Sequence, residues 1–141
     1  MNQSALLYPV FAQVALTYLM LFWMGRVRVG ALQGGALKVK DIALGQDAWP
    51  PRVLQVSNSF HNQLELPILF YAVCGLALVT QQLSWPLIML AWTFVALRLG
   101  HVLVHTTSNN VQRRFMVFIL GALVLLAMWI VFAIGVVQSG R

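Results

Sequence analysis

The sequence predicts an all-helical integral membrane protein, folded as a bundle of four transmembrane helices. Its composition indicates this first, because hydrophobic residues fill 60% of the 141 positions and charged residues only 9%, whereas about a quarter of a soluble domain is charged. Its pattern agrees, since four separate apolar stretches approach the roughly 20 residues that a helix needs to cross a bilayer. No internal repeat is visible, so residues 1–141 are predicted to form a single four-helix membrane domain.

The four helices are predicted at about residues 5–25, 57–80, 85–106 and 112–137. In the first, only Gln13 and Thr17 interrupt the apolar run. No basic residue precedes this run and no small-residue cleavage site follows Met24, so it is interpreted as a retained anchor and not as a secretory signal. The second helix contains Cys74, the single cysteine of the chain. An internal disulfide is therefore excluded, and we interpret Cys74 as a small core residue.

Basic residues predict the orientation of these helices. They gather in a loop at about residues 26–56 and in the connection between the third and fourth helices, while the turn at residues 81–84 has none. Lys and Arg stay on the cytoplasmic side, so both basic segments are predicted to be cytoplasmic and both termini to face outward. The net charge of +6 then reflects topology and attraction to membrane lipids, and no nucleic-acid partner is expected.

The loop at 26–56 is too long for a simple connector and is expected to be a partly ordered cytoplasmic cover. Within it, residues 36–44 are predicted to form a short interfacial helix, with Lys38 and Lys40 toward the lipid headgroups. Long cationic side chains at this boundary commonly extend to headgroups. That interpretation is favoured for Arg26, Lys38, Lys40 and Arg52, but not for Arg98, which lies more than a turn inside the third helix.

Ionisable residues inside apolar helices are costly and mark functional sites. Glu65, the only acidic residue in any predicted helix, stands three positions after Asn62, and Arg98, His101 and His105 have the spacing of a single helix face. An unpaired carboxylate in hydrocarbon would be protonated, so Glu65 is expected to pair with Arg98 or with another arginine.

That pairing leaves an excess of positive charge at the cytoplasmic level, from Arg28, Arg113 and Arg114. The planar guanidinium group binds carboxylates through two hydrogen bonds. The residues therefore predict a pocket for a small anionic ligand that carries more than one carboxylate, with Glu65 available for an ammonium group.

The ordered set of these motifs resembles a known family. Arg26-Val27-Arg28 is followed by His61-Asn62-Gln63-Leu64-Glu65-Leu66-Pro67, then by Leu97-Arg98-Leu99-Gly100-His101, and then by Arg113-Arg114. In this order they resemble the MAPEG superfamily, membrane-associated proteins in eicosanoid and glutathione metabolism, and its uncharacterised bacterial branch in particular. The resemblance covers all four predicted helices.

The resemblance implies a homotrimer in a bacterial inner membrane, with glutathione as co-substrate bound between neighbouring subunits near the cytoplasmic side. It implies a glutathione-dependent transferase or peroxidase acting on lipophilic electrophiles. Arg114 would be the catalytic residue, because it would stabilise the glutathione thiolate. The glutathione-binding residues would be Arg28, Asn62, Glu65, Arg98, His101, His105 and Arg113.

The chain departs from the family pattern at two site positions. A tyrosine that several family enzymes place one turn after the Arg-x-x-His motif is replaced by His105, and Phe115 stands where prostaglandin E synthase has a hydroxyl residue. His105 is interpreted either as a hydrogen-bond donor in place of the phenol or as a structural histidine.

Two further hypotheses are retained. A non-catalytic family member would be a trimeric lipid-binding protein or scaffold that does not form a thiolate. A metal or haem protein would use His101 and His105, four residues apart on one helix, together with His61 and Glu65, which repeat that spacing on another helix. Against the metal hypothesis, Arg98 and the other arginines at this level would repel a cation.

Overall fold

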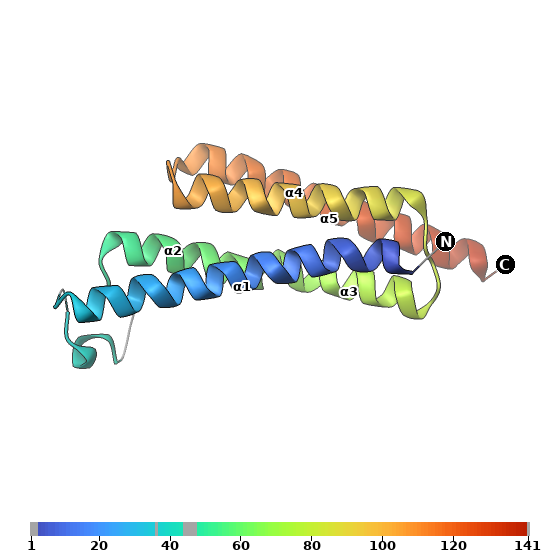
Figure 1. Cartoon of the computed structure of the whole chain (residues 1–141). Helices are drawn as coiled ribbons and strands as arrows, with labels where there is room; N and C mark the ends of the chain where they lie inside the picture. The colour runs from blue at the N-terminus through green and yellow to red at the C-terminus, as the bar shows by residue number, and fades with distance from the viewer. Residues whose placement is uncertain (1–2, 36, 44–47, 141) are drawn as a thin grey trace.

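The computed structural model describes residues 3–35, 37–43 and 48–140 (Figure 1). The described chain contains α-helices and two short 3₁₀ helices and no strand. In chain order, the elements are α1 (Ser4–Gln33), η1 (Val39–Ile42), α2 (Pro51–His61), η2 (Asn62–Leu64), α3 (Leu66–Val79), α4 (Trp85–Thr106) and α5 (Val111–Ser139).

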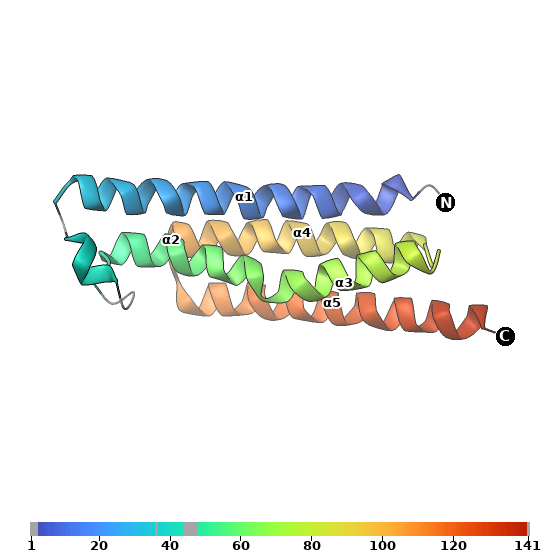
Figure 2. The same cartoon turned by 90° about the horizontal axis from the view of Figure 1, so that it is seen from below.

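These helices form an antiparallel bundle. Figures 1 and 2 show both termini at one end, with η1 and the turn between α4 and α5 at the opposite end. In the view of Figure 2, α1 and α5 lie on the two sides, with α4, α2 and α3 between them. Among the described residues, four helical stretches are long and apolar enough to cross a membrane: Ser4–Gln33, Pro51–Val79, Trp85–Thr106 and Val111–Ser139. The predicted all-helical membrane fold is confirmed.

The predicted loop at 26–56 has the wrong limits. α1 continues to Gln33 and α2 already begins at Pro51, so residues 34–50 connect the two helices. The apolar run marks only the part of a helix that crosses hydrocarbon, and a helix continues into the headgroup region wherever its backbone remains hydrogen-bonded. Proline starts α2 because its missing N–H costs nothing in the first helical turn.

The interfacial helix predicted at 36–44 is not present as an α-helix in the described part of the chain. There, Val39–Ile42 form a 3₁₀ helix, and the Asp41 carboxylate accepts a hydrogen bond of 3.1 Å from the backbone N–H of Lys38. Residues 36 and 44 themselves lie outside the described residues. A carboxylate that accepts from its own turn favours this tight local structure over a longer helix.

The second membrane crossing is broken in its middle. Glu65, with φ −95° and ψ −98°, lies outside the helical region between η2 and α3. Pro67 explains the break, because it has no N–H to donate to the carbonyl of Gln63 four positions earlier and its ring would clash with that carbonyl in a continuous helix. The break leaves backbone carbonyls of η2 without helical partners and places Asn62 and Glu65 on non-α-helical backbone, which shapes the site described below.

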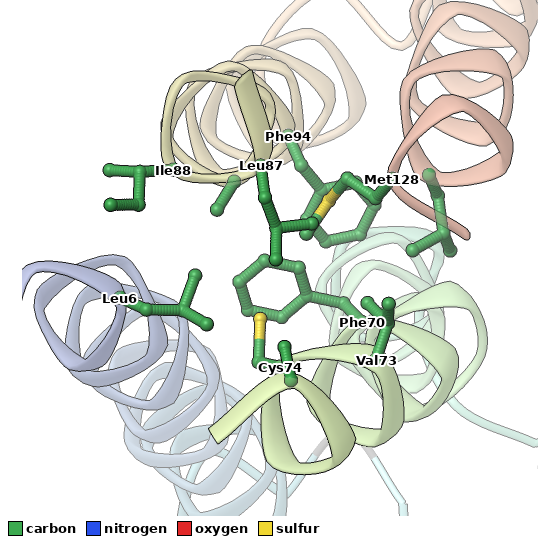
Figure 3. Close-up of a cluster of buried hydrophobic side chains, with 11 residues drawn as sticks. Leu6, Phe70, Val73, Cys74, Leu87, Ile88, Phe94 and Met128 are labelled. Atoms are coloured by element: carbon green, nitrogen blue, oxygen red, sulfur yellow. The ribbon is translucent and has the colours of Figure 1, made fainter. Parts of the chain in front are cut away.

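The apolar core lies on the side of this break nearer the termini and joins all four crossings (Figure 3). Phe70 of α3 stacks on Phe94 of α4, with ring centroids 4.8 Å apart and an interplanar angle of 14°. Leu6 of α1 and Met128 of α5 pack against the same cluster. Cys74 also belongs to it and is 1% exposed, in agreement with its interpretation as a core residue.

A buried amide pair joins α1 to the break. Gln13 Nε2 donates to Gln63 Oε1 over 3.0 Å, and both side chains are at most 1% exposed. Hydrogen bonds between polar side chains in an apolar environment fix the register of neighbouring helices, because slippage would leave both groups unsatisfied. The pair therefore holds η2 against α1.

Candidate functional site

A cavity of about 540 Å³ opens beside the break in the second crossing. Volumes of about 300–1,000 Å³ are typical of small-molecule sites. The side chains that line it come from α2, η2, α4 and α5 and from the break itself: Asn58, His61, Asn62, Glu65, His101, His105, Val111, Arg114, Phe115 and Phe118. Polar groups from three of the four crossings thus meet at one site.

The predicted site residues divide into three groups. Asn62, Glu65, His101, His105 and Arg114 line the cavity. Arg98 is not part of its lining but lies buried at 1% exposure and contacts the backbone of Asn62. Arg28 and Arg113 lie outside the cavity.

Arg28 and Arg113 have other surroundings within this subunit. Arg28 Nε donates to Ser57 Oγ over 3.3 Å, and its guanidinium lies 5.2 Å from the centroid of the Trp49 ring. Arg113 is exposed, and its backbone N–H donates to the Asn110 side chain that caps α5, over 3.0 Å. Of these three arginines, only Arg114 places its positive charge in the wall of the cavity within one subunit.

The predicted ion pair of Glu65 with an arginine is wrong for the described chain. Arg98 Nη2 donates instead to the backbone carbonyl of Asn62, and no described cation lies within ion-pair distance of the Glu65 carboxylate. The break explains the difference, because it frees a carbonyl that competes for the guanidinium and turns Glu65 outward, where it is exposed. The two charges still attract each other electrostatically.

Arg98 remains incompletely satisfied. Its Nε and Nη1 atoms are buried without a hydrogen-bond partner among the described residues. A buried guanidinium has five donors, and each donor left without an acceptor carries a desolvation cost. Arg98 therefore holds the Asn62 backbone in place and contributes a positive charge behind the cavity wall, without a direct ion pair to a described carboxylate.

Arg114 lies between two neutral acceptors. Its Nη1 is 3.2 Å from His105 Nε2 and 2.9 Å from Asn109 Oδ1. A guanidinium only donates, so Nε2 of His105 is the acceptor and its proton is on Nδ1. His105 Nδ1 is buried without a described partner. Of the two interpretations of His105, the contact with Arg114 favours the structural histidine, because Nε2 accepts and does not donate.

Two polar residues of the lining were not among the predicted site residues. Asn58 precedes Asn62 by four positions and His61 precedes Glu65 by four, so the same helical spacing that identified the predicted pair extends to them. The sequence pattern could not identify the apolar residues of the lining, because apolar residues fill every face of the fourth crossing. These residues are Val111, Phe115 and Phe118. They supply the apolar part of the cavity wall.

The end of α4 is held by side chains of α2. Arg52 Nη1 donates to the carbonyl of Thr106 over 2.5 Å, and Gln55 Nε2 donates to the carbonyl of His105 over 2.6 Å. The last carbonyls of a helix have no partner within it, so these contacts satisfy groups that would otherwise need water. Arg52, expected to extend to lipid headgroups, joins two helices instead, and its guanidinium lies 5.4 Å from the Trp23 ring centroid.

Arg52→Ala is expected to destabilise the protein by about 1–2 kcal/mol, because it removes a charge-assisted hydrogen bond to a helix end. Denaturant titration of the detergent-solubilised protein measures the change. Arg26→Ala is the matched control, since no hydrogen bond joins Arg26 to another described residue. Equal free energies of unfolding in the two variants would show that the hydrogen bond from Arg52 to Thr106 contributes nothing to stability.

The metal hypothesis has no ligand set in the described chain. His101 and His105 lie with ring centroids 5.7 Å apart. No group of three His, Cys, Asp or Glu side chains suited to holding a metal ion occurs among the described residues. The cation Arg114, whose Nη1 lies 3.2 Å from His105 Nε2, would repel a metal ion at this place.

Comparison with known proteins gives one match. No curated protein and no solved structure matches the chain. The family model described as the MAPEG family matches residues 6–134, which include most of each of the four membrane crossings and the whole cavity lining. This chain therefore belongs to the MAPEG family and is an integral, multi-pass membrane protein of that glutathione- and eicosanoid-related group.

Proposed function

We propose that the cavity binds glutathione and that the protein is a transferase or peroxidase in a bacterial inner membrane, in which the glutathione sulfur attacks lipophilic electrophiles. The observation that carries this proposal is the convergence of Asn62, Glu65, His101 and Arg114 on one cavity that also has an apolar wall. A site for a polar tripeptide beside a site for an apolar molecule needs both kinds of surface.

The charges of the site complement those of glutathione, which has two carboxylates, one ammonium group and a thiol. Arg114 and the positive charge of Arg98 behind the wall suit the carboxylates or a thiolate, and Glu65 is the single acidic side chain in the lining. Because no described cation pairs with Glu65, its carboxylate is available for the ammonium group. Asn58 and Asn62 add amide groups for the peptide bonds.

The chemistry that we assign to Arg114 is stabilisation of the thiolate. A free thiol has a pKa of about 8.5, and lowering this pKa by about two units requires about 2.7 kcal/mol of preferential stabilisation of the anion. A guanidinium group at a partly buried position can supply an effect of this size. In the transferase reaction, the thiolate sulfur forms a bond to an electrophilic carbon while the bond from that carbon to its leaving group breaks, and the leaving group takes a proton. In the peroxidase reaction, the sulfur bonds to one peroxide oxygen while the O–O bond breaks, the alkoxide takes a proton, and a second glutathione converts the sulfenic acid to glutathione disulfide and water.

We further propose that the working unit is a homotrimer, with glutathione at the boundary between subunits. The cavity is open on one side, where Val111 and Phe115 are 65% and 63% exposed. A neighbouring subunit would cover this side and exclude water from the thiolate. Arg28, which lies outside the cavity of its own subunit, would then belong to the site of a neighbour.

Titration calorimetry and thiolate absorbance of the detergent-solubilised protein test the proposal together. We expect glutathione to bind with measurable heat, and the bound thiol to show thiolate absorbance at neutral pH. S-methylglutathione is the matched ligand, because it keeps the peptide and cannot ionise. No heat with either ligand would remove glutathione as the ligand of this cavity.

Two observations favour a second candidate, a non-catalytic protein that binds glutathione without ionising the thiol. His105 occupies a donor of Arg114, and Phe115 offers no hydroxyl group at the cavity. Equal affinities for glutathione and S-methylglutathione, without a thiolate signal, would support this candidate over the transferase.

A further inference from the structure

The turn between α4 and α5 contains a residue in a conformation that costs energy. Asn109 has a φ of 46°, in the left-handed region, and its backbone N–H donates to the carbonyl of Val104 over 2.8 Å. A residue with a Cβ atom pays about 1 kcal/mol for this conformation, which glycine adopts without strain. Asparagine tolerates the region better than most residues, and its side chain can add an interaction that glycine lacks.

That side chain contacts the proposed catalytic arginine. Asn109 Oδ1 accepts from Arg114 Nη1 over 2.9 Å, and His105 Nε2 lies 3.2 Å from the same nitrogen. Nη1 carries two hydrogens, so the two acceptors use both of them. The edge formed by Nε and Nη2 makes no hydrogen bond to a described residue and remains free to bind an anion through two parallel bonds.

We propose that Asn109 is a positioning residue, which holds Nη1 of Arg114 and thereby presents the Nε and Nη2 edge to the ligand. This inference rests on the proposed function. An arginine side chain has several rotatable bonds, and fixing it before the ligand arrives removes an entropic cost from binding. Asn109 does not touch the ligand and acts through Arg114.

The acceptors of Arg114 are both neutral, which matters for a group that stabilises a thiolate. A carboxylate at position 109 would hold the guanidinium more strongly but would cancel much of its charge. An amide oxygen fixes the geometry and leaves the positive charge available. Asn109→Asp therefore keeps the orientation of the Arg114 guanidinium but reduces the effect of its positive charge, so that the two contributions can be measured separately.

Asn109→Gly is the central variant, because glycine adopts the left-handed conformation without strain and lacks the acceptor oxygen. We expect its melting temperature to equal or exceed that of the wild type, while the Kd for glutathione rises about five- to tenfold. Asn109→Asp is expected to bind glutathione but to lose most of its thiolate absorbance at neutral pH. Gln81→Gly, which relieves a φ of 58° in the turn at the other end of the bundle, should leave binding and thiolate absorbance unchanged.

A double-mutant cycle tests whether Asn109 acts through Arg114. In an Arg114→Ala background, Asn109→Gly should change the Kd by less than about twofold, because coupled residues are not additive. An equal loss in both backgrounds would overturn the proposal, as would wild-type affinity and thiolate absorbance in Asn109→Gly.

A readout without ligand separates this inference from the proposed function. Nitrogen-15 NMR of the arginine side chains measures rotation about the Nε–Cζ bond of Arg114. We expect slow rotation in the wild type and faster rotation in Asn109→Gly. If the wild type binds no glutathione, the proposed function fails. Unchanged rotation in Asn109→Gly would overturn the positioning role, whether or not glutathione binds.

Discussion

Arg114→Ala is expected to weaken glutathione binding about 100-fold and to abolish the thiolate absorbance of the bound ligand. Each hydrogen bond between a charged and a polar group contributes about 1.5–3 kcal/mol, and about 1.4 kcal/mol corresponds to a tenfold change in Kd. Removal of the free edge of the guanidinium removes up to two such bonds and the charge that stabilises the anion. Calorimetry and difference absorbance measure the two effects separately.

Arg113→Ala is the matched control for this variant. The two arginines are adjacent in sequence and carry the same charge at the same end of α5, but only Arg114 lines the cavity. Arg113→Ala should therefore change the Kd by less than about threefold, through weakened long-range attraction alone. Comparable losses in the two variants would mean that the arginines act by general charge, and the assignment of a specific role to Arg114 would be wrong.

Arg114→Lys adds a test of geometry. Lysine keeps the positive charge but lacks the planar fork, so it cannot donate to Asn109 and His105 and also bind an anion through two parallel bonds. We expect a Kd between those of the wild type and Arg114→Ala. Wild-type affinity in Arg114→Lys would show that the site needs only a point charge.

The fold could be predicted from the sequence because the bilayer restricts the choices severely. Every backbone N–H and C=O group in hydrocarbon needs a partner within the protein, so an apolar run of sufficient length is a helix. The limits of the helices could not be predicted in the same way. The headgroup region imposes no such constraint, and α1 continues through Arg26 and Arg28 to Gln33.

The position of the site along the helices was also predictable, and so were many of the residues that line it. Spacing of three or four residues placed Asn62 near Glu65 and His101 near His105, and these four residues line one cavity with Arg114. The predicted ion pair between Glu65 and an arginine was wrong, because helical spacing assumes a continuous helix. Pro67 interrupts that helix, and the freed carbonyl of Asn62 takes the guanidinium of Arg98.

The contacts of Arg52 and Asn109 depend on how distant elements pack. Arg52 reaches a carbonyl 54 positions away in the chain, and no periodic pattern encodes such a pairing. Asn109 lies close to Arg114 in sequence, but its contact depends on a left-handed residue in the turn. Asparagine in a short loop is too common to predict that conformation by itself.

Phe94→Ala is expected to produce the largest loss of stability among core substitutions, about 3 kcal/mol. Phe94 is fully buried and stacks on Phe70, and it joins α4 to α3 in the centre of the apolar core (Figure 3). In a bilayer, the hydrophobic effect contributes little between helices, so the loss comes from dispersion contacts and from the cavity that the missing ring leaves. Denaturant titration in detergent measures the free energy of unfolding.

Trp92→Ala provides the control for Phe94→Ala on the same helix. Trp92 is larger than Phe94 but 45% exposed, so lipid or detergent replaces most of the contacts that its ring loses. We expect this variant to lose less than about 1 kcal/mol, in line with substitutions away from the packed core. If Trp92→Ala were as destabilising as Phe94→Ala, the outward face of α4 would have to pack against protein, and the neighbouring subunit would then be the partner to examine.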